Sequence, residues 1–169
     1  MPKSKQFPCV AILVDIRSLY NVGSIFRTAD ALGISKLYLV GTTGQPHPKE
    51  PWRSDHQRLA KTALGAEQSV PWQYFPEITP LIKRLRQANF SLLSLELKPA
   101  STSIIDWQPP ATPLALLLGN EVKGLSEDIL QASDSVLHIP MLGHKESLNV
   151  SVAFGIAAFW LKNKPQLIL

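Results

Sequence analysis

The sequence has few residues of the kinds that build disulfides, metal sites or common catalytic motifs. Cys9 is the single cysteine among 169 residues, so no internal disulfide can form, and we expect a small buried thiol in a reducing compartment. The four histidines have no zinc-ligand spacing and no H-E-x-x-H motif occurs, so no metal site is predicted. The G-x-S-x-G, G-x-G-x-x-G and P-loop patterns are also missing, which gives no support to the common hydrolase and nucleotide-binding classes.

Long hydrophobic runs are missing too. The apolar segment 10–16 is interrupted by Asp15 and followed by Arg17, so it predicts a first strand and not a secretory signal. No stretch approaches the roughly 18 to 20 apolar residues that span a bilayer. The 17 Lys and Arg outnumber the 13 Asp and Glu, which permits an anionic partner such as RNA without requiring one. We therefore expect a soluble, cytoplasmic protein that does not act at a membrane.

The apolar pattern predicts an α/β fold with a single, mostly parallel sheet flanked by helices. Near-continuous apolar runs are typical of strands that are buried on both faces. Such runs lie at 10–16, 36–40, 90–97, 114–118 and 136–141. Helical patterns lie at 22–32, 55–64, 77–88, from 126 onward, and at about 148–163. The last helix is apolar nearly all round, so we expect it to be buried in the core or at a subunit interface.

Helix ends are also predicted. Asn21 and Ser147 are expected to be the N-caps of the first and last helices, and Gly33 stands where a C-terminal glycine belongs. The proline-rich stretches 45–51 and 108–113 are predicted to be surface loops within one domain.

Three polar segments follow predicted strands, where α/β sheets bind their ligands. The first, 21–27, indicates by itself only a capped amphipathic helix whose Arg27 faces solvent, paired with Asp30 in the simplest interpretation. The second, 116–125, is glycine-rich, and an ordinary strand-to-helix turn would explain it. The third, 138–151, starts an apolar helix with more polar side chains than packing requires. Buried polar groups need partners, and ligand atoms can supply them.

Two basic clusters could contact nucleic acid. The stretch 49–61 contains Trp52 among its basic residues, and such a mixture can grip phosphates and stack on unpaired bases. The simpler alternative is a solvated helix face, which we prefer for the second cluster, 83–86. For the first cluster we expect RNA contacts from Arg53, Arg58 and Lys61.

In order and spacing, the three polar segments resemble the motifs of the SpoU, or TrmH-like, branch of the SPOUT RNA methyltransferases. They read Asn21-x-Gly23-x-x-x-Arg27, Leu118-Gly-Asn-Glu121-x-x-Gly124 and Ile139-Pro-Met-x-Gly143-x-x-Glu146-Ser-Leu-Asn149. Val122 departs from the pattern, because many members have glycine there. The resemblance implies a trefoil knot in the C-terminal part of the fold, although knots are rare exceptions in general. It also implies a homodimer, and a single SpoU-type catalytic domain over residues 1–169.

The resemblance further implies methyl transfer from S-adenosylmethionine to a ribose 2'-hydroxyl of tRNA or rRNA, with S-adenosylhomocysteine as product and no metal. Arg27 is expected to reach the partner subunit's site, as a base or as an electrostatic clamp, and it also joins the RNA-binding set. A guanidinium normally stays protonated, which favours the clamp. The catalytic residues implied are Arg27, Asn21, Glu121, Ser147 and Asn149. The cofactor-binding residues implied are Leu95, Glu96, Gly119, Asn120, Ile139, Met141, Ser147 and Leu148.

Three other interpretations compete with this one. The chain could be a non-catalytic RNA-binding protein that retains the fold, although such a protein would be expected to have lost Arg27 or Asn149. It could be a SPOUT enzyme that methylates a base, although the first motif favours ribose. An unrelated nucleotide-binding α/β domain is disfavoured by the missing phosphate-binding glycine pattern.

Overall fold

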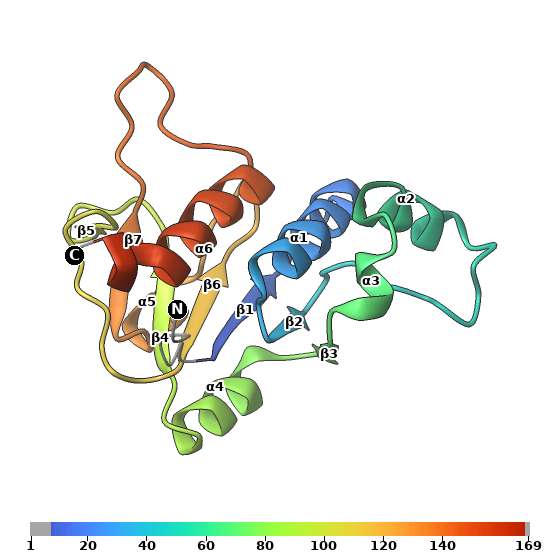
Figure 1. Cartoon of the computed structure of the whole chain (residues 1–169), viewed down its shortest axis with the longest axis horizontal. Helices are drawn as coiled ribbons and strands as arrows, with labels where there is room; N and C mark the ends of the chain where they lie inside the picture. The colour runs from blue at the N-terminus through green and yellow to red at the C-terminus, as the bar shows by residue number, and fades with distance from the viewer. Residues whose placement is uncertain (1–7, 168–169) are drawn as a thin grey trace.

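A single parallel sheet organises the protein (Figure 1). The computed structural model describes residues 8–167, with side chains to residue 163. Seven strands lie in the order β3-β2-β1-β6-β4-β7-β5, and each pairing between neighbours is parallel. The strands are β1 (Cys9–Val14), β2 (Lys36–Val40), β3 (Trp72–Phe75), β4 (Ser91–Leu95), β5 (Thr102–Ser103), β6 (Leu114–Leu118) and β7 (Ser135–His138). The predicted fold class is confirmed.

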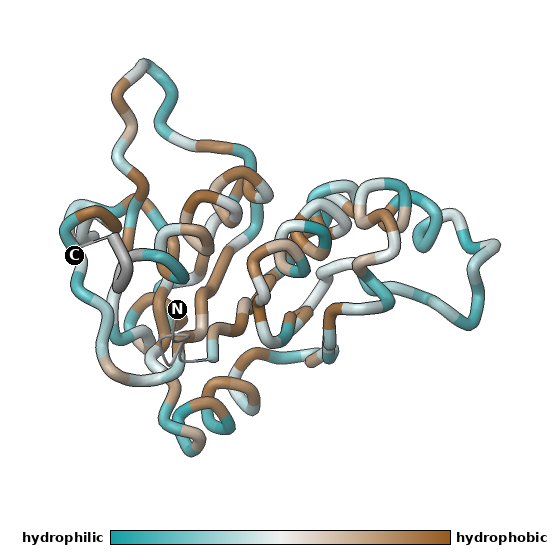
Figure 2. The backbone as a smooth tube through the Cα atoms, in the orientation of Figure 1, coloured by the Kyte–Doolittle hydropathy of each residue, from teal (hydrophilic) through white to brown (hydrophobic). Residues whose placement is uncertain are grey.

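The strand predictions hold best where the chain is most apolar. β1 and β6 are buried along their whole length, as expected of central parallel strands. The sequence did not predict β3 or β5, which lie at the two edges of the sheet. Every residue of β3 is half-buried, so an edge strand of this kind lacks the apolar run that identifies its neighbours. Figure 2 shows the contrast between the brown central strands and the largely teal loop from β2 to α2.

Helices cover both faces of the sheet. Along β1, alternate side chains enter two separate apolar clusters, because successive side chains of a strand point to opposite faces. One cluster is shared with α1 (Leu19–Leu32), α2 (Ser54–Ala63), α3 (Ala66–Ser69) and α6 (Val150–Leu167). The other is shared with α4 (Ile78–Gln87) and α5 (Glu127–Gln131).

Both N-cap predictions were wrong, because Asn21 lies inside α1 and Ser147 lies in the loop before α6. Ser18, not Asn21, caps α1, and its Oγ accepts from the Asn21 backbone N–H at 3.3 Å. α6 begins at Val150, and the Asn149 Oδ1 accepts from the Ser151 N–H at 2.9 Å, so Asn149 takes the capping role expected of Ser147. Gly33 ends α1 in the left-handed conformation (φ 63°), as predicted.

The prediction that α6 is buried in the core or at a subunit interface is confirmed for the core-facing side of the helix, and for the other side it stays a prediction. Phe154, Ala157 and Ala158 are fully buried against the core, whereas Ile156 and Phe159 are 42% and 53% exposed. An apolar sequence does not distinguish a face that packs on the same chain from one that does not. α6 therefore has an apolar face that this chain leaves uncovered.

The path of the chain brings the three motif segments to one region. After β7, the chain passes through the loop of residues 139–149, and α6 returns to pack against α1 and β6. The first turn of α1, the end of β6 and the start of α6 thus become neighbours (Figure 1). The trefoil knot stays a prediction.

Candidate active site

One chain of hydrogen bonds joins the three motif segments. The Asn21 Nδ2 donates to the Glu121 Oε1 at 3.0 Å, and the Asn149 Nδ2 donates to the Asn21 Oδ1 at 3.1 Å. The Asn149 Oδ1 in turn accepts from the Ser151 N–H and hydroxyl at 2.9 and 2.7 Å. We call Asn21, Glu121 and Asn149 the polar cluster. Three of the five predicted catalytic residues are therefore in direct contact.

The direction of this hydrogen-bond chain is fixed at both ends. A carboxylate such as that of Glu121 only accepts, and a backbone N–H such as that of Ser151 only donates. Neither Asn21 nor Asn149 can exchange its amide oxygen and nitrogen without losing a hydrogen bond. The cluster is thus preorganised within one chain, at the rim of a polar hollow that Arg17, Ser18 and Lys123 also line.

The loop of the second motif is held by its own side chains. The Asn120 Nδ2 donates to the Asp15 carbonyl at 2.8 Å, and its Oδ1 accepts from the N–H groups of Val122 and Lys123 at 2.9 and 3.1 Å. Gly119 lies so close to the backbone of Gly124 that a Cβ would overlap it. The Asn120 side chain therefore fixes the loop, and we expect Asn120 itself to meet a ligand through its main chain.

Six of the eight predicted cofactor residues line one small hollow at the carboxyl ends of β4, β6 and β7. They are Leu95, Glu96, Ile139, Met141, Ser147 and Leu148. Gly119 and Asn120 do not line it. We call it the cofactor-loop pocket. Its volume of about 110 Å³ is below the roughly 300–1,000 Å³ usual for ligand sites, and the loop after β7 stands away from the body of the protein (Figure 1).

Glu96 connects this pocket to the second motif. Its Oε2 accepts from the Leu125 N–H at 2.9 Å, and a Cβ at Gly124 would overlap the same carboxylate. Gly124 also has φ 68°, so glycine is required there for two reasons. The Glu96 carboxylate therefore positions the loop that carries Glu121.

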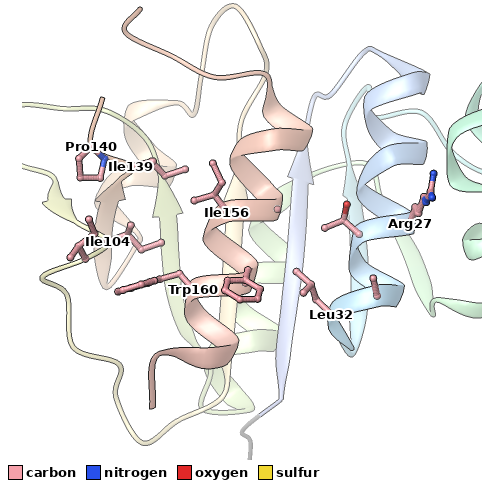
Figure 3. Close-up of a pocket in the computed structure, with 12 residues that line it drawn as sticks. Arg27, Leu32, Ile104, Ile139, Pro140, Ile156 and Trp160 are labelled. Carbon is pink, nitrogen blue, oxygen red and sulfur yellow. The ribbon is translucent and has the colours of Figure 1, made fainter. Parts of the chain in front are cut away.

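Arg27 lies apart from the polar cluster of its own chain. Its side chain is exposed, and within residues 8–163 it makes no ion pair, so the expected pairing with Asp30 is not formed. The Asp30 carboxylate instead accepts from the Ser69 hydroxyl at 2.8 Å. Arg27 stands at the edge of an apolar groove, with its guanidinium turned away from α6 (Figure 3).

The groove itself lies between α1, α6 and the segment around β5. It has a volume of about 700 Å³. Its walls include the side chains of Leu32, Ile104, Ile139, Ile156 and Phe159. We call it the apolar groove, and it contains the uncovered face of α6.

The basic residues of α2 and of its N-cap position differ in whether they already form ion pairs. Arg53 pairs with Asp55 at 2.7 Å and with Glu50 at 3.4 Å. Hydrogen bonding from Arg53 holds the pKa of the Asp55 carboxyl well below its usual range. Arg58 and Lys61 are exposed, and Arg58 donates to the Ser54 carbonyl of its own helix. Of the predicted RNA contacts in this stretch, Arg53 is the one already committed to carboxylates.

Two basic residues of the site were missed by sequence reasoning. Arg17 and Lys123 both line the polar hollow that contains the polar cluster. Arg17 follows the first strand, and Lys123 lies within the second motif. This position at strand ends is the signal that could have identified them.

Among the described residues, no group of three or more histidine, cysteine, aspartate or glutamate side chains could hold a metal ion. Cys9 is buried, as predicted, and burial raises its thiol pKa to about 11.

The part of the chain that the structure describes contains no helix long and apolar enough to span a membrane.

Known proteins are similar to this chain in both sequence and fold. The SpoU rRNA Methylase family model matches residues 8–159. The 23S rRNA (guanosine-2'-O-)-methyltransferase RlmB of Haemophilus influenzae is 31% identical over 92% of this chain and 60% of its own. The tRNA (guanosine(18)-2'-O)-methyltransferase of Thermus thermophilus is 27% identical over 93% of this chain and 75% of its own.

A solved structure agrees. The AdoMet-bound rRNA methyltransferase of Sinorhizobium meliloti has a TM-score of 0.84 and 26% identity, over 95% of this chain and 57% of that one. The chain spans 57% to 75% of the length of these three proteins. The resemblance seen in the three motifs is confirmed, and the chain belongs to the SpoU rRNA methylase family.

Proposed function

We propose that this protein is an S-adenosylmethionine-dependent RNA methyltransferase that acts on a ribose 2'-hydroxyl of tRNA or rRNA. The observation that carries the proposal is the polar cluster, in which Asn21, Glu121 and Asn149 meet although 100 and 128 residues separate Asn21 from its two partners. Packing alone does not require such a chain of side-chain amides. Relatives of the same family are named as guanosine-2'-O-methyltransferases of tRNA and 23S rRNA, and the S. meliloti structure contains bound AdoMet.

The cofactor-loop pocket suits the proposed cofactor in chemistry. Leu95, Ile139, Met141 and Leu148 offer apolar contacts to an adenine ring, and strand ends expose main-chain donors and acceptors. Its present volume holds only part of such a ligand. The loop of residues 142–149 is exposed throughout, and we infer that it folds inward over the ligand. Ser147, at the pocket, then contacts the cofactor.

The reacting groups need positioning and charge stabilisation. When bound, S-adenosylmethionine supplies an electrophilic methyl group. A ribose hydroxyl is a poor nucleophile until its proton is drawn off. We assign the polar cluster to holding the ribose. Because guanidinium groups normally remain cations in proteins, we assign Arg27 to gripping the neighbouring phosphate and stabilising the negative charge that develops on the 2'-oxygen, while phosphate or water takes the proton.

We also propose that two copies assemble through the apolar groove. Ile156 and Phe159 are exposed on the groove, and large exposed apolar surfaces mark interaction sites. Arg27 lies at the edge of the same groove and has no ion pair within residues 8–163. A symmetric pair built on this face would bring each Arg27 toward the other copy. The single catalytic domain over residues 1–169 also stays a proposal, which the match of the family model to residues 8–159 supports.

Nucleoside analysis tests the proposed reaction. Total RNA from cells that lack this protein is incubated with the purified protein and labelled S-adenosylmethionine, and the product is digested to nucleosides. We expect label in a 2'-O-methyl nucleoside at a site that is unmethylated in the deletion strain. Label on a base would support the base-methylating alternative. RNA binding without label would support the non-catalytic alternative.

A further inference from the structure

We propose that Arg17 and Lys123 form a phosphate-binding subsite for the RNA strand. The inference rests on the proposed function, because it assigns a contact to the RNA whose ribose the polar cluster holds. The subsite requires two cationic side chains that form no ion pair and that stand on a fixed backbone beside the polar cluster. Four features of the described residues support it.

The first feature is position. Arg17, Lys123 and Asn120 line two hollows of about 500 Å³ each. One of these hollows also contains the polar cluster. A phosphate bound by the two cations would therefore share a hollow with the residues proposed to hold the ribose, and in RNA a phosphate adjoins every ribose.

The second feature is that both charges are free. Arg17 and Lys123 are exposed and form no ion pair within residues 8–163. Arg53 and Arg86 differ, because each forms an ion pair with a carboxylate at 2.7 Å. An arginine already paired offers less to a phosphate than one whose whole guanidinium is available.

The third feature is that the carboxylates in these hollows face other donors. The Asp15 Oδ1 accepts from the N–H and hydroxyl of Thr42 at 2.8 and 3.0 Å. The Glu121 Oε1 accepts from Asn21. Both acids lie in a hollow with the two cations, yet neither forms an ion pair with them. The cations are thus left to meet an outside anion.

The fourth feature is rigidity of the backbone that carries the cations. The Asn120 Oδ1 accepts from the Lys123 N–H at 3.1 Å. On the other side, the Ile16 N–H, next to Arg17, donates to the Thr43 Oγ1 at 3.0 Å, and that hydroxyl donates to the Leu13 carbonyl at 2.8 Å. Fixed attachment points reduce the entropy lost when an anion binds.

The test compares Arg17→Gln and Lys123→Gln with the matched control Lys83→Gln, which removes an exposed lysine on α4. Filter binding of end-labelled total RNA from cells lacking the protein is measured over a range of salt concentrations. Methyl transfer to the same RNA is measured in parallel. For each subsite variant we expect weaker RNA binding and a salt slope reduced by about 1. In methyl transfer, we expect KM for RNA to rise by more than kcat falls, with unchanged affinity for S-adenosylmethionine.

The possible outcomes distinguish failure of the subsite from failure of the proposed function. If the wild type methylates RNA but both variants match Lys83→Gln in KM and salt slope, the subsite is wrong and the function stands. A fall in kcat with unchanged KM would also overturn it, because the residues would then act on the chemical step. If the wild type binds RNA without methylating it and the variants lose salt-dependent binding, the subsite stands and the proposed function fails.

Discussion

The polar cluster and the apolar groove both lie beside α1 and α6, and they differ in what a single chain completes. In the cluster, Asn21 and Asn149 satisfy each other and Glu121 within one molecule. In the groove, Ile156 and Phe159 remain exposed. Fully burying one such side chain contributes about 1.5–3 kcal/mol, and here only part of that contribution is realised, because Ile156 and Phe159 are 42% and 53% exposed. The polar cluster is therefore complete within one chain, whereas the apolar groove is left uncovered, and a second copy is the partner proposed to cover it.

Arg27→Ala should have the largest effect on this comparison, because Arg27 is the group proposed to pass from the groove of one copy to the cluster of the other. We expect kcat to fall by about 10²–10³-fold, which is typical of removing one donor that stabilises transition-state charge. Affinity for S-adenosylmethionine, measured by calorimetry, should stay nearly unchanged. Arg27→Lys should recover only part of the activity, because lysine lacks the planar fork. Near-normal methylation by Arg27→Ala would show that Arg27 has no part in the reaction.

Phe159→Asp should disrupt assembly through the apolar groove and leave the polar cluster intact. A carboxylate in a buried apolar interface lacks a partner, so we expect the dimer Kd to rise by about a hundredfold or more. Sedimentation should detect monomers, and methylation should fall with the loss of dimer. The matched control is Leu64→Asp, on a side chain that is 66% exposed outside the groove. If Phe159→Asp sediments as the wild type does, the groove is not the interface.

Asn149→Asp should break the cluster and leave both the helix cap and the groove intact. The new carboxylate keeps an oxygen for the Ser151 N–H but loses the donor to Asn21. We expect kcat to fall by about tenfold, the scale of one hydrogen bond left unmade. Thermal stability should change little, whereas Asn149→Ala also loses the cap and about 1 kcal/mol. Equal losses of stability in the two variants would argue that the cluster only supports the fold.

Arg53→Gln should have the smallest effect, because Arg53 belongs to neither surface and already pairs with Asp55. We expect KM for RNA to change by less than about twofold, as for exposed ion pairs in general. Lys61→Gln should raise KM more, because Lys61 is exposed and forms no ion pair in the described part of the chain. A larger effect at Arg53 than at Lys61 would show that RNA displaces Asp55.

The sequence predicted the strands and helix ends that are determined by a local pattern of residues. Continuous apolar runs predicted β1 and β6, and Gly33 predicted the end of α1. It did not predict that Ser18 caps α1, because both Ser18 and Asn21 suit that position. It also could not predict the contact between Asn21 and Asn149, since they are 128 residues apart and only the return of α6 to α1 joins them. The two faces of α6 were inseparable in sequence, because both are apolar.

Mixing two inactive variants tests most directly whether the site is shared between copies. Arg27→Ala lacks the arginine and Asn21→Ala lacks the cluster, so each homodimer should be nearly inactive. If Arg27 acts on the partner's cluster, a mixed dimer has one complete site. After exchange at equal concentrations, methylation should rise to about a quarter of the wild-type rate, since about half of the dimers are then mixed. A mixture no more active than its two components would contradict the shared site.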